Sequence, residues 1–492
     1  MVSDIKNYNR RIQTSTAISI EKKNNIFQIL LFLLMAVLAL FVSFLILSDD
    51  TKPAYYSWLF LLPLTFMLMS VICCRIYYEI PRNLGLTIIV VLLFTRTVLS
   101  PFFMYFGNYD ATITLGVENN TEDAILLVVY ETIVLFLVMY FRAFHIFRPL
   151  KQIDSPKNIL RSGGMRNYTI LLIIALILLF ICILITPQLI QSYRTIFHIN
   201  DEFFTSYEDA YTIEKYGTTF VKKLSLVTGF YLMRALLIIV PAYIIVNLSK
   251  YHTPFRKAIC FICCFIPLFF IGGAIASSLI YIICLLFLYN FKFYREKVFM
   301  RSIILLCFGA IAVVFWWVFR SDPAELAEQF SSRFSAYFSG VNVVSGVFNL
   351  PDELEYKLRY FVYDFTSTIP FGSTIFNISN ERIPAFFNHY NMSQGQIPST
   401  IGMGYYYLGP IFAPSYSVVF ALIVLSAGEK LKLQTNDNPM QYIRLLLIVF
   451  YVSMGIIMYN IEITMTNIFS IILPMYIMEK ISFRKEKGKN AS

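Results

Sequence analysis

Charged residues are scarce in this sequence. Only 14% of the 492 residues are Asp, Glu, Lys or Arg, whereas 58% are hydrophobic. A typical soluble domain has about 25% charged and roughly 45–50% apolar residues, and the mean hydropathy here is +0.65. This composition excludes a soluble multidomain enzyme, a disordered chain and a fibre. It predicts an all-α polytopic membrane protein.

Several functional signatures are also missing. The sequence contains no glycine-rich phosphate-binding loop of the Walker or Rossmann type, which excludes an ATP-driven pump within this chain. It shows no internal repeat, which argues against an inverted-repeat transporter. The 4 histidines have no metal-ligand spacing, and the 8 cysteines all fall within expected membrane spans. We therefore expect no metal, no other cofactor and no disulfide framework.

Long apolar runs are what the sequence does contain. A membrane helix needs about 20 apolar residues, and the sequence predicts about twelve such spans within a single integral membrane domain, residues 1–492. The expected spans are 26–47, 55–74, 84–106, 123–144, 168–187, 225–248, 258–272, 274–291, 299–319, 401–427, 441–459 and 463–479. The seventh and eighth form one apolar run interrupted by Pro267 and Gly272-Gly273, which predicts a short hairpin.

The distribution of charge predicts the orientation. Most of the 40 lysines and arginines fall in one set of loops and at both ends of the chain, while most of the 30 acidic residues fall in the opposite loops. The positive-inside rule then places both termini in the cytoplasm. Because the net charge of +10 follows from topology, it gives no support to nucleic-acid binding.

Two extracytoplasmic segments are long: residues 188–224 and, between the ninth and tenth spans, residues 320–400. The second begins with Ser321-Asp322-Pro323, which predicts a helix over residues 323–338. Its apolar side chains share one face: Leu326, Phe330, Phe334 and Tyr337. Arg333 lies on this apolar side, and a charge there needs a partner. That partner is either an anionic substrate beside the membrane, or lipid headgroups or an acidic side chain.

Three charged residues fall deep inside expected spans, well away from the span ends: Arg96, Glu131 and Arg234. Such residues are normally paired or line a cavity. The single acid can pair with only one of the two arginines, so the other needs an anion from elsewhere. A diphosphate group fits, because arginine binds phosphate oxygens through two parallel hydrogen bonds. The alternative is that both arginines extend towards headgroups or face a polar outer cavity.

The entry to the tenth span combines glycines and tyrosines. It reads Ile397-Pro398-Ser399 and continues through Gly402 to Gly404-Tyr405-Tyr406-Tyr407-Leu408-Gly409-Pro410. Gly402, Gly404 and Gly409 allow close backbone approach, and the tyrosines supply stacking faces and hydroxyl groups. The same pattern is also typical of an interfacial aromatic belt and a helix-packing seam.

These features together resemble the Wzy-type O-antigen and capsular polysaccharide repeat-unit polymerases of bacteria. The similar segments are residues 333–340, the entry to the tenth span and the hairpin over residues 258–291. At the hairpin turn this chain has Gly272-Gly273-Ala274, where the family has Gly-Ser-Arg, so the turn arginine is missing. The resemblance implies a membrane glycosyltransferase of the C-type fold in the bacterial cytoplasmic membrane.

The resemblance also implies the reaction. A polyprenyl-diphosphate-linked oligosaccharide is the donor, and its glycan moves to the terminal sugar of an incoming lipid-linked repeat unit. A base must accept the proton of the attacking hydroxyl, and cations must face the diphosphate leaving group. The candidates for the base are His389, which is otherwise a plain loop histidine, Asp364 and Glu381. The candidates for substrate binding are Arg96, Arg234, Arg320, Arg333, Tyr337, Arg359, Arg382 and Tyr406.

Expected partners are the lipid bilayer, the lipid-linked oligosaccharide, and a chain-length regulator and a flippase of the same pathway. Two other functions remain open. A flippase or exporter of lipid-linked oligosaccharide would also place arginines in a cavity, but it would not need the long loop over residues 320–400. An O-antigen ligase would share the chemistry of the polymerase.

Overall fold

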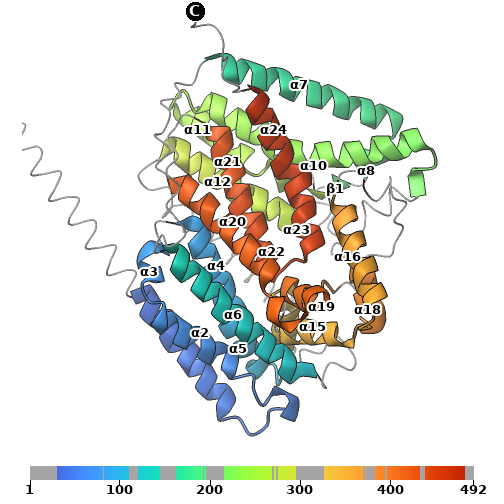
Figure 1. Ribbon diagram of the computed structural model, residues 1–492. Coiled ribbons are helices and arrows are strands. Elements are labelled where there is room, and N and C mark those ends of the chain that lie inside the picture. Colours follow the sequence, from blue (N-terminus) through green and yellow to red (C-terminus); the bar gives the residue numbers. More distant parts are fainter. Residues whose placement is uncertain are drawn as a thin grey trace, which may run out of the picture.

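The computed structural model describes residues 30–80, 83–109, 120–143, 162–191, 193–194, 215–268, 271–272, 275–294, 326–338, 340–369, 372, 383–393, 396–432 and 438–482. Figure 1 shows that this part of the chain is built from helices. Eight of them are apolar and long enough to cross a membrane: Leu30–Leu47, Ala54–Ile72, Leu84–Phe106, Thr121–Ala143, Arg166–Ile185, Phe220–Leu248, Pro439–Ile457 and Ile461–Ser482. The chain is therefore a polytopic helical membrane protein, as its composition predicts.

These spans consist of the following elements: η1 (Ala54–Tyr56), α2 (Leu61–Ile72), α4 (Leu84–Phe94), η3 (Thr95–Leu99), α5 (Ser100–Phe106), α6 (Thr121–Ala143), α7 (Ser162–Ile185), α10 (Phe220–Leu248), α21 (Pro439–Leu447), η10 (Ile448–Val452), α22 (Ser453–Ile457), α23 (Ile461–Asn467), η11 (Ile468–Ile472) and α24 (Leu473–Ser482). The segments η3, η10 and η11 are π-helical. They widen three otherwise regular spans, and η3 carries the intramembrane residue Arg96.

The eight helices agree with eight of the expected spans. The hairpin expected over residues 258–291 is present as two short helices in contact, α11 (Pro254–Cys263) and α12 (Ile275–Phe293). Between them, η7 (Ile266–Leu268) contains the proline that interrupts the run. The expected ninth span, residues 299–319, lies outside the described residues, and the total of twelve stays a prediction.

The expected tenth span, residues 401–427, is wrong as a single helix. The chain forms α19 (Thr400–Phe412) and α20 (Ser415–Lys432), which meet at 105°. Gly409 adopts a φ of 76°, a conformation that favours glycine, and Pro410 follows it. The bend folds the chain back on itself, so that the Ala413 carbonyl lies directly against Gly404.

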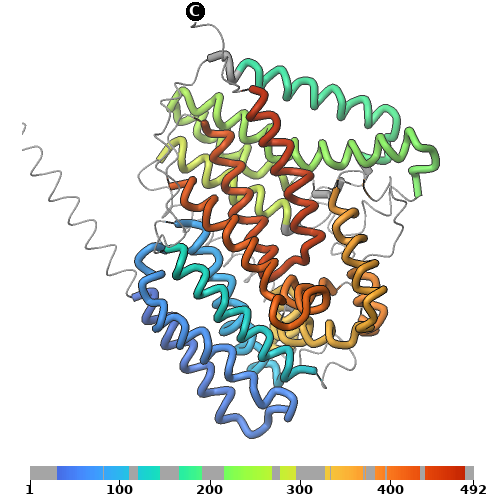
Figure 2. Tube along the Cα trace, viewed as in Figure 1, coloured from blue at the N-terminus to red at the C-terminus, as the bar shows by residue number. Residues whose placement is uncertain are grey.

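Helix α20 occupies the centre of the bundle. It contacts α4 and α6 on one side and α21, η10 and α22 on the other. Figure 2 shows the blue N-terminal helices and the green helices α7 and α10 on opposite sides of the orange and red C-terminal ones. Helices α10 and α24 both pack on α7, and α12 packs on α21.

Two ion pairs join helix ends on the expected cytoplasmic side. Arg142 at the end of α6 donates to both carboxylate oxygens of Glu429 on α20, at 2.7 and 3.1 Å. Arg444 on α21 donates to Glu479 on α24 at 2.8 Å. The first pair links helices far apart in sequence, and the second links the last two spans.

The opposite end of the bundle carries the described part of the long loop over residues 320–400, which we expect on the outer face: α14 (Leu326–Tyr337), α15 (Val341–Ser345), η9 (Gly346–Asn349), α16 (Leu354–Thr368) and α18 (Ile383–Tyr390). The remaining short elements are α3 (Ile76–Glu79), α8 (Gln188–Gln191) and the strands β1 (Tyr193–Arg194) and β2 (Ile271–Gly272). The strands pair antiparallel, with Tyr193 opposite Gly272. In Figure 1, α15, α16, α18 and α19 gather at the end of the bundle away from the C-terminal end of α24.

Helix α14 agrees with the expectation of a helix over residues 323–338. Its Phe330 and Phe334 rings stack on Phe103 of α5, at centroid distances of 5.4 and 4.5 Å. The small residues Ser331 and Ser335 are fully buried on the packed side. The apolar face thus packs against the third span.

The contact between Gly404 and Ala413 provides a test of the bend. A Gly404→Ala substitution places a Cβ atom on the Ala413 carbonyl, which is backbone and cannot move aside. We expect a loss of about 1–3 kcal/mol in stability, as for other overpacked sites. The measurement is thermal unfolding of the purified protein in detergent.

The comparison variant is Gly402→Ala, whose new Cβ meets a methyl group of the Val347 side chain rather than backbone. We expect a smaller loss for this variant. Equal stability of Gly404→Ala and the wild type would contradict the described bend.

Candidate functional site

A buried carboxylate and a tyrosine form the centre of the candidate site. Asp364 lies in the second half of α16 and is 5% exposed. The Tyr407 hydroxyl, on α19, donates to its Oδ2 atom at 2.7 Å. Because burying a carboxylate is costly without partners, this hydrogen bond fixes both the position and the orientation of Asp364. Among the residues proposed from the sequence as the base, Asp364 is buried in the structure.

Aromatic side chains surround this pair. Tyr360, one turn before Asp364, packs on Phe386 of α18 with ring centroids 4.0 Å apart. Phe361 meets Tyr407 edge to face at 5.5 Å. The Tyr406 hydroxyl donates to the Pro351 carbonyl at 2.9 Å. These contacts join α16, α18 and α19 into one cluster.

Two cations lie on the same helix as Asp364. Lys357 pairs with Asp352 and lies over the Tyr406 ring, 5.6 Å from its centroid. Arg359 donates to the Tyr363 hydroxyl at 3.3 Å and is exposed. Arg359 is therefore an exposed cation beside the aromatic cluster, whereas Lys357 is already paired with Asp352 and the same half of α16 also carries the exposed Glu355. This agrees with the expected role of Arg359 in holding an anion, a role that stays a prediction.

Asparagine side chains fix the cluster to the bundle. Asn391 donates to the Gly346 and Phe387 carbonyls and accepts from Asn349, each at 2.9 Å. The Asn349 oxygen in turn accepts from Asn120, just before α6. Asn342 accepts from Tyr56 at 2.7 Å. These neutral hydrogen bonds attach the outer loop to the first spans.

The turn between the last two spans adds a second attachment. The Thr400 hydroxyl lies within hydrogen-bond distance of two carbonyl oxygens, at 2.6 Å from Gly455 and 2.8 Å from Tyr459. Burial raises the pKa of Tyr459 to about 12, with a further contribution from Tyr337. Tyr459 is therefore a neutral phenol at physiological pH. It adds no negative charge to the end of the bundle at which we expect an anionic substrate.

The other two base candidates differ from Asp364. His389 lies near the end of α18, is exposed, and has its ring edge against Tyr390. Glu381 lies outside the described residues. His389 belongs to the helix that packs on α16 through Phe386, but it is not enclosed as Asp364 is.

The intramembrane arginines have different surroundings. Arg96 pairs with Glu131 of α6 at 2.5 Å, with both side chains buried, and the Ser417 hydroxyl of α20 donates to the same carboxylate. The expected pairing of one arginine with the single acid is therefore confirmed. Arg234 lies half-buried in α10, and its backbone carbonyl accepts from Tyr281 at 3.0 Å.

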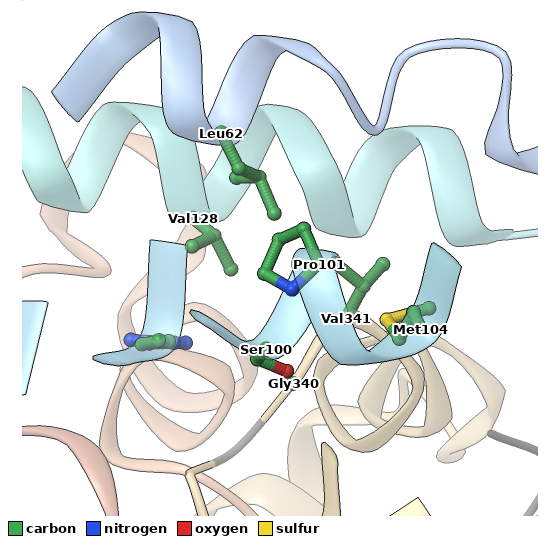
Figure 3. A pocket seen from close by; sticks show the side chains of 8 residues that line it. Leu62, Ser100, Pro101, Met104, Val128, Gly340 and Val341 are labelled. Carbon is green, nitrogen blue, oxygen red and sulfur yellow. The ribbon is translucent and has the colours of Figure 1, made fainter. Parts of the chain in front are cut away.

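Arg96 also borders a small pocket, shown in Figure 3. Apolar side chains dominate the walls: Leu62, Pro101, Met104, Val128 and Val341, together with Ser100 and Gly340. The gap is too narrow to admit a sugar ring. The pairing and this lining make Arg96 primarily a structural residue, and its role in substrate binding stays a prediction.

The remaining expected substrate contacts fall at the ends of the outer loop. Tyr337 is 48% exposed at the end of α14, and Arg333 lies on the same helix. Arg320 and Arg382 lie outside the described residues. The Tyr406 hydroxyl is already bound to the Pro351 carbonyl, so Tyr406 supports the cluster, and its role in substrate binding stays a prediction.

The main residue that sequence reasoning missed is Tyr407, the partner of Asp364. It is one of three consecutive tyrosines, and the sequence does not distinguish among them. The asparagines were also missed, although Asn342 and Asn349 stand out as polar residues in an apolar stretch. Among the described residues, no three His, Cys, Asp or Glu side chains gather as a metal site requires.

Comparisons with family models, with curated proteins and with solved structures found no match.

The buried Arg96–Glu131 pair allows a test of its structural role. Removing one partner leaves an unpaired buried charge, so we expect Arg96→Met to lose about 3–5 kcal/mol of stability. The double variant Arg96→Met, Glu131→Leu removes both charges and should recover most of that loss. Thermal unfolding in detergent measures both effects.

A matched control is Arg142→Met, which breaks a partly exposed pair at the end of α6. We expect a smaller loss there. If Arg96→Met were no less stable than Arg142→Met, the buried pair would not have the assigned role.

Proposed function

We propose that the protein polymerises polyprenyl-diphosphate-linked oligosaccharide repeat units into a surface polysaccharide, an O-antigen or a capsule. In this proposal the reaction takes place on the outer face of the bacterial cytoplasmic membrane. The reaction class is glycosyl transfer from a lipid diphosphate, so the membrane itself delivers the donor. This proposal accounts for the position of Asp364, the candidate base, at one end of a helical bundle.

The observation that carries the proposal is the enclosed Asp364. A carboxylate is fixed by Tyr407 at the expected outer end of the bundle, within an aromatic cluster and one to two turns from Lys357 and Arg359. A base and a cation for the leaving group are the two groups that transfer of a sugar from a lipid diphosphate requires.

The proposed step assigns a role to each group. An acceptor sugar hydroxyl attacks the anomeric carbon of the donor, and its proton passes to the Asp364 carboxylate. The bond between the anomeric carbon and the diphosphate oxygen breaks, and its electron pair leaves with the lipid diphosphate. Arg359, together with Arg333 by its position on α14, is assigned to hold that leaving group, since arginine forms paired hydrogen bonds with phosphate oxygens. Tyr407 keeps the carboxylate oriented.

The alternative of a flippase or exporter has weaker support. A flippase must move its cargo between the two faces, and an enclosed carboxylate at one end of the bundle has no evident part in that movement. A ligase would use the same groups as a polymerase and differ only in the acceptor. The products in cells separate these three functions.

The test uses cells that lack the protein and are complemented with variants. A polymerase deletion should leave single repeat units on the cell surface, and the wild-type gene should restore a ladder of long chains on a gel. We expect Asp364→Asn and Arg333→Ala to insert normally and give no ladder, because one lacks the base and the other a cation for the leaving group.

The matched control is Glu355→Gln, which removes an exposed carboxylate from the same helix and should give a normal ladder. Lipid-linked units trapped inside the deletion cells would reject the polymerase in favour of a flippase. A normal ladder from well-expressed Asp364→Asn or Arg333→Ala would reject that residue's assigned role.

A further inference from the structure

Helix α16 has an unusual distribution of side chains around its axis. One stripe is apolar and exposed, with exposed fractions between 37% and 70%. Its members recur at helical spacing along one side: Leu354, Leu358, Phe361, Val362, Phe365 and Ile369 just after the helix. A soluble protein rarely leaves such a continuous apolar row in water.

The side of α16 that packs against the protein is more polar than this stripe. Tyr360, Asp364 and Thr368 follow each other at four-residue intervals and are all buried. A helix on the surface of a soluble protein buries its apolar stripe and exposes its polar side. In α16 the polar side is buried and the apolar stripe is exposed. This arrangement is expected for a helix whose outer side faces an environment less polar than the protein side that it packs against.

A third side of α16 is polar and at least partly exposed. Glu355 and Arg359 are exposed, and Thr366 is partly exposed on the same side. Between Arg359 and Ile369 the only charged residue is Asp364, which faces inward. The helix thus has a protein side, an apolar side and a polar side, the arrangement of a helix lying in a membrane interface.

The apolar stripe continues onto elements that belong to the membrane-embedded bundle. Phe361 meets Tyr407 of α19, and the next residue, Leu408, is exposed, as are Ile411 and Phe412. Helix α16 also packs against α23, which begins the last span. The exposed apolar surface of α16 is therefore adjacent to surface that a bilayer covers.

We propose that α16 lies in the outer leaflet of the membrane, with its apolar stripe against lipid acyl chains and its Glu355–Arg359 side towards the headgroups and water. The partner of this surface is the acyl chain region of the bilayer, identified by the reversed polarity of the helix and by its continuity with the spans. Part of the loop over residues 320–400 would then be membrane-embedded. This proposal does not depend on the proposed reaction.

The test is photo-crosslinking of the full-length protein in native membranes. Phe365 on the stripe and Glu355 on the polar side are each replaced by p-benzoylphenylalanine, which leaves the native cysteines unchanged. After irradiation, the protein is analysed by mass spectrometry. We expect a phospholipid adduct at Phe365 and none at Glu355. Leu358 provides a second stripe position if the Phe365 variant does not accumulate.

Each other result would overturn the proposal. An adduct between the stripe and a second copy of the chain would make this face a homodimer interface. An adduct with another polypeptide would make it a docking site for a protein partner. No lipid adduct at either Phe365 or Leu358, or equal lipid adducts at Phe365 and Glu355, would show that the stripe has no preferred contact with acyl chains.

Discussion

Polar groups at membrane depth have no water to bind and must find partners within the protein. This requirement is met here by side chains from different spans. The buried Arg96 on η3 pairs with Glu131 on α6, and Ser417 on α20 binds the same carboxylate. Two consecutive spans and the distant helix α20 are thus fixed at one point. The hydroxyl group of Thr400, at the start of α19, lies within hydrogen-bond distance of carbonyl oxygens at the turn between the last two spans.

The position of α20 in turn determines where the candidate site lies. Glu131 and Ser417 hold α20 against α6, and the 105° bend turns α19 away from the axis of α20. This orientation brings Tyr407 to α16, where it binds Asp364. The expected cytoplasmic end of the bundle is joined by ion pairs, whereas the outer end is joined by asparagine, threonine and tyrosine hydrogen bonds. A neutral framework leaves Arg359 as an exposed cation on α16 for an anionic substrate, with Glu355 exposed on the same side and Lys357 already paired with Asp352.

The sequence predicts features that depend on local composition. Eight spans follow from run length and hydropathy, because a membrane helix must be apolar over its whole length. The sequence predicted at most one ion pair for Glu131, the single acid deep inside the expected spans, but did not distinguish Arg96 from Arg234 as its partner. The bend at Gly409 was missed, because one glycine of positive φ changes the direction of the chain without changing its hydropathy. Tyr407 was missed for a related reason: its contact with Asp364 joins residues 43 positions apart and depends on that bend.

The central claim is that this bundle joins lipid-linked repeat units without a nucleotide-binding domain. It is tested most directly by placing the purified full-length protein in liposomes with lipid-linked repeat units extracted from cells that lack it. The products are then separated by size and analysed by mass spectrometry. The account predicts chains that lengthen by whole repeat units and release polyprenyl diphosphate, with no ATP or nucleotide sugar added. Substrates that keep their length, or that cross the bilayer unchanged, would contradict it.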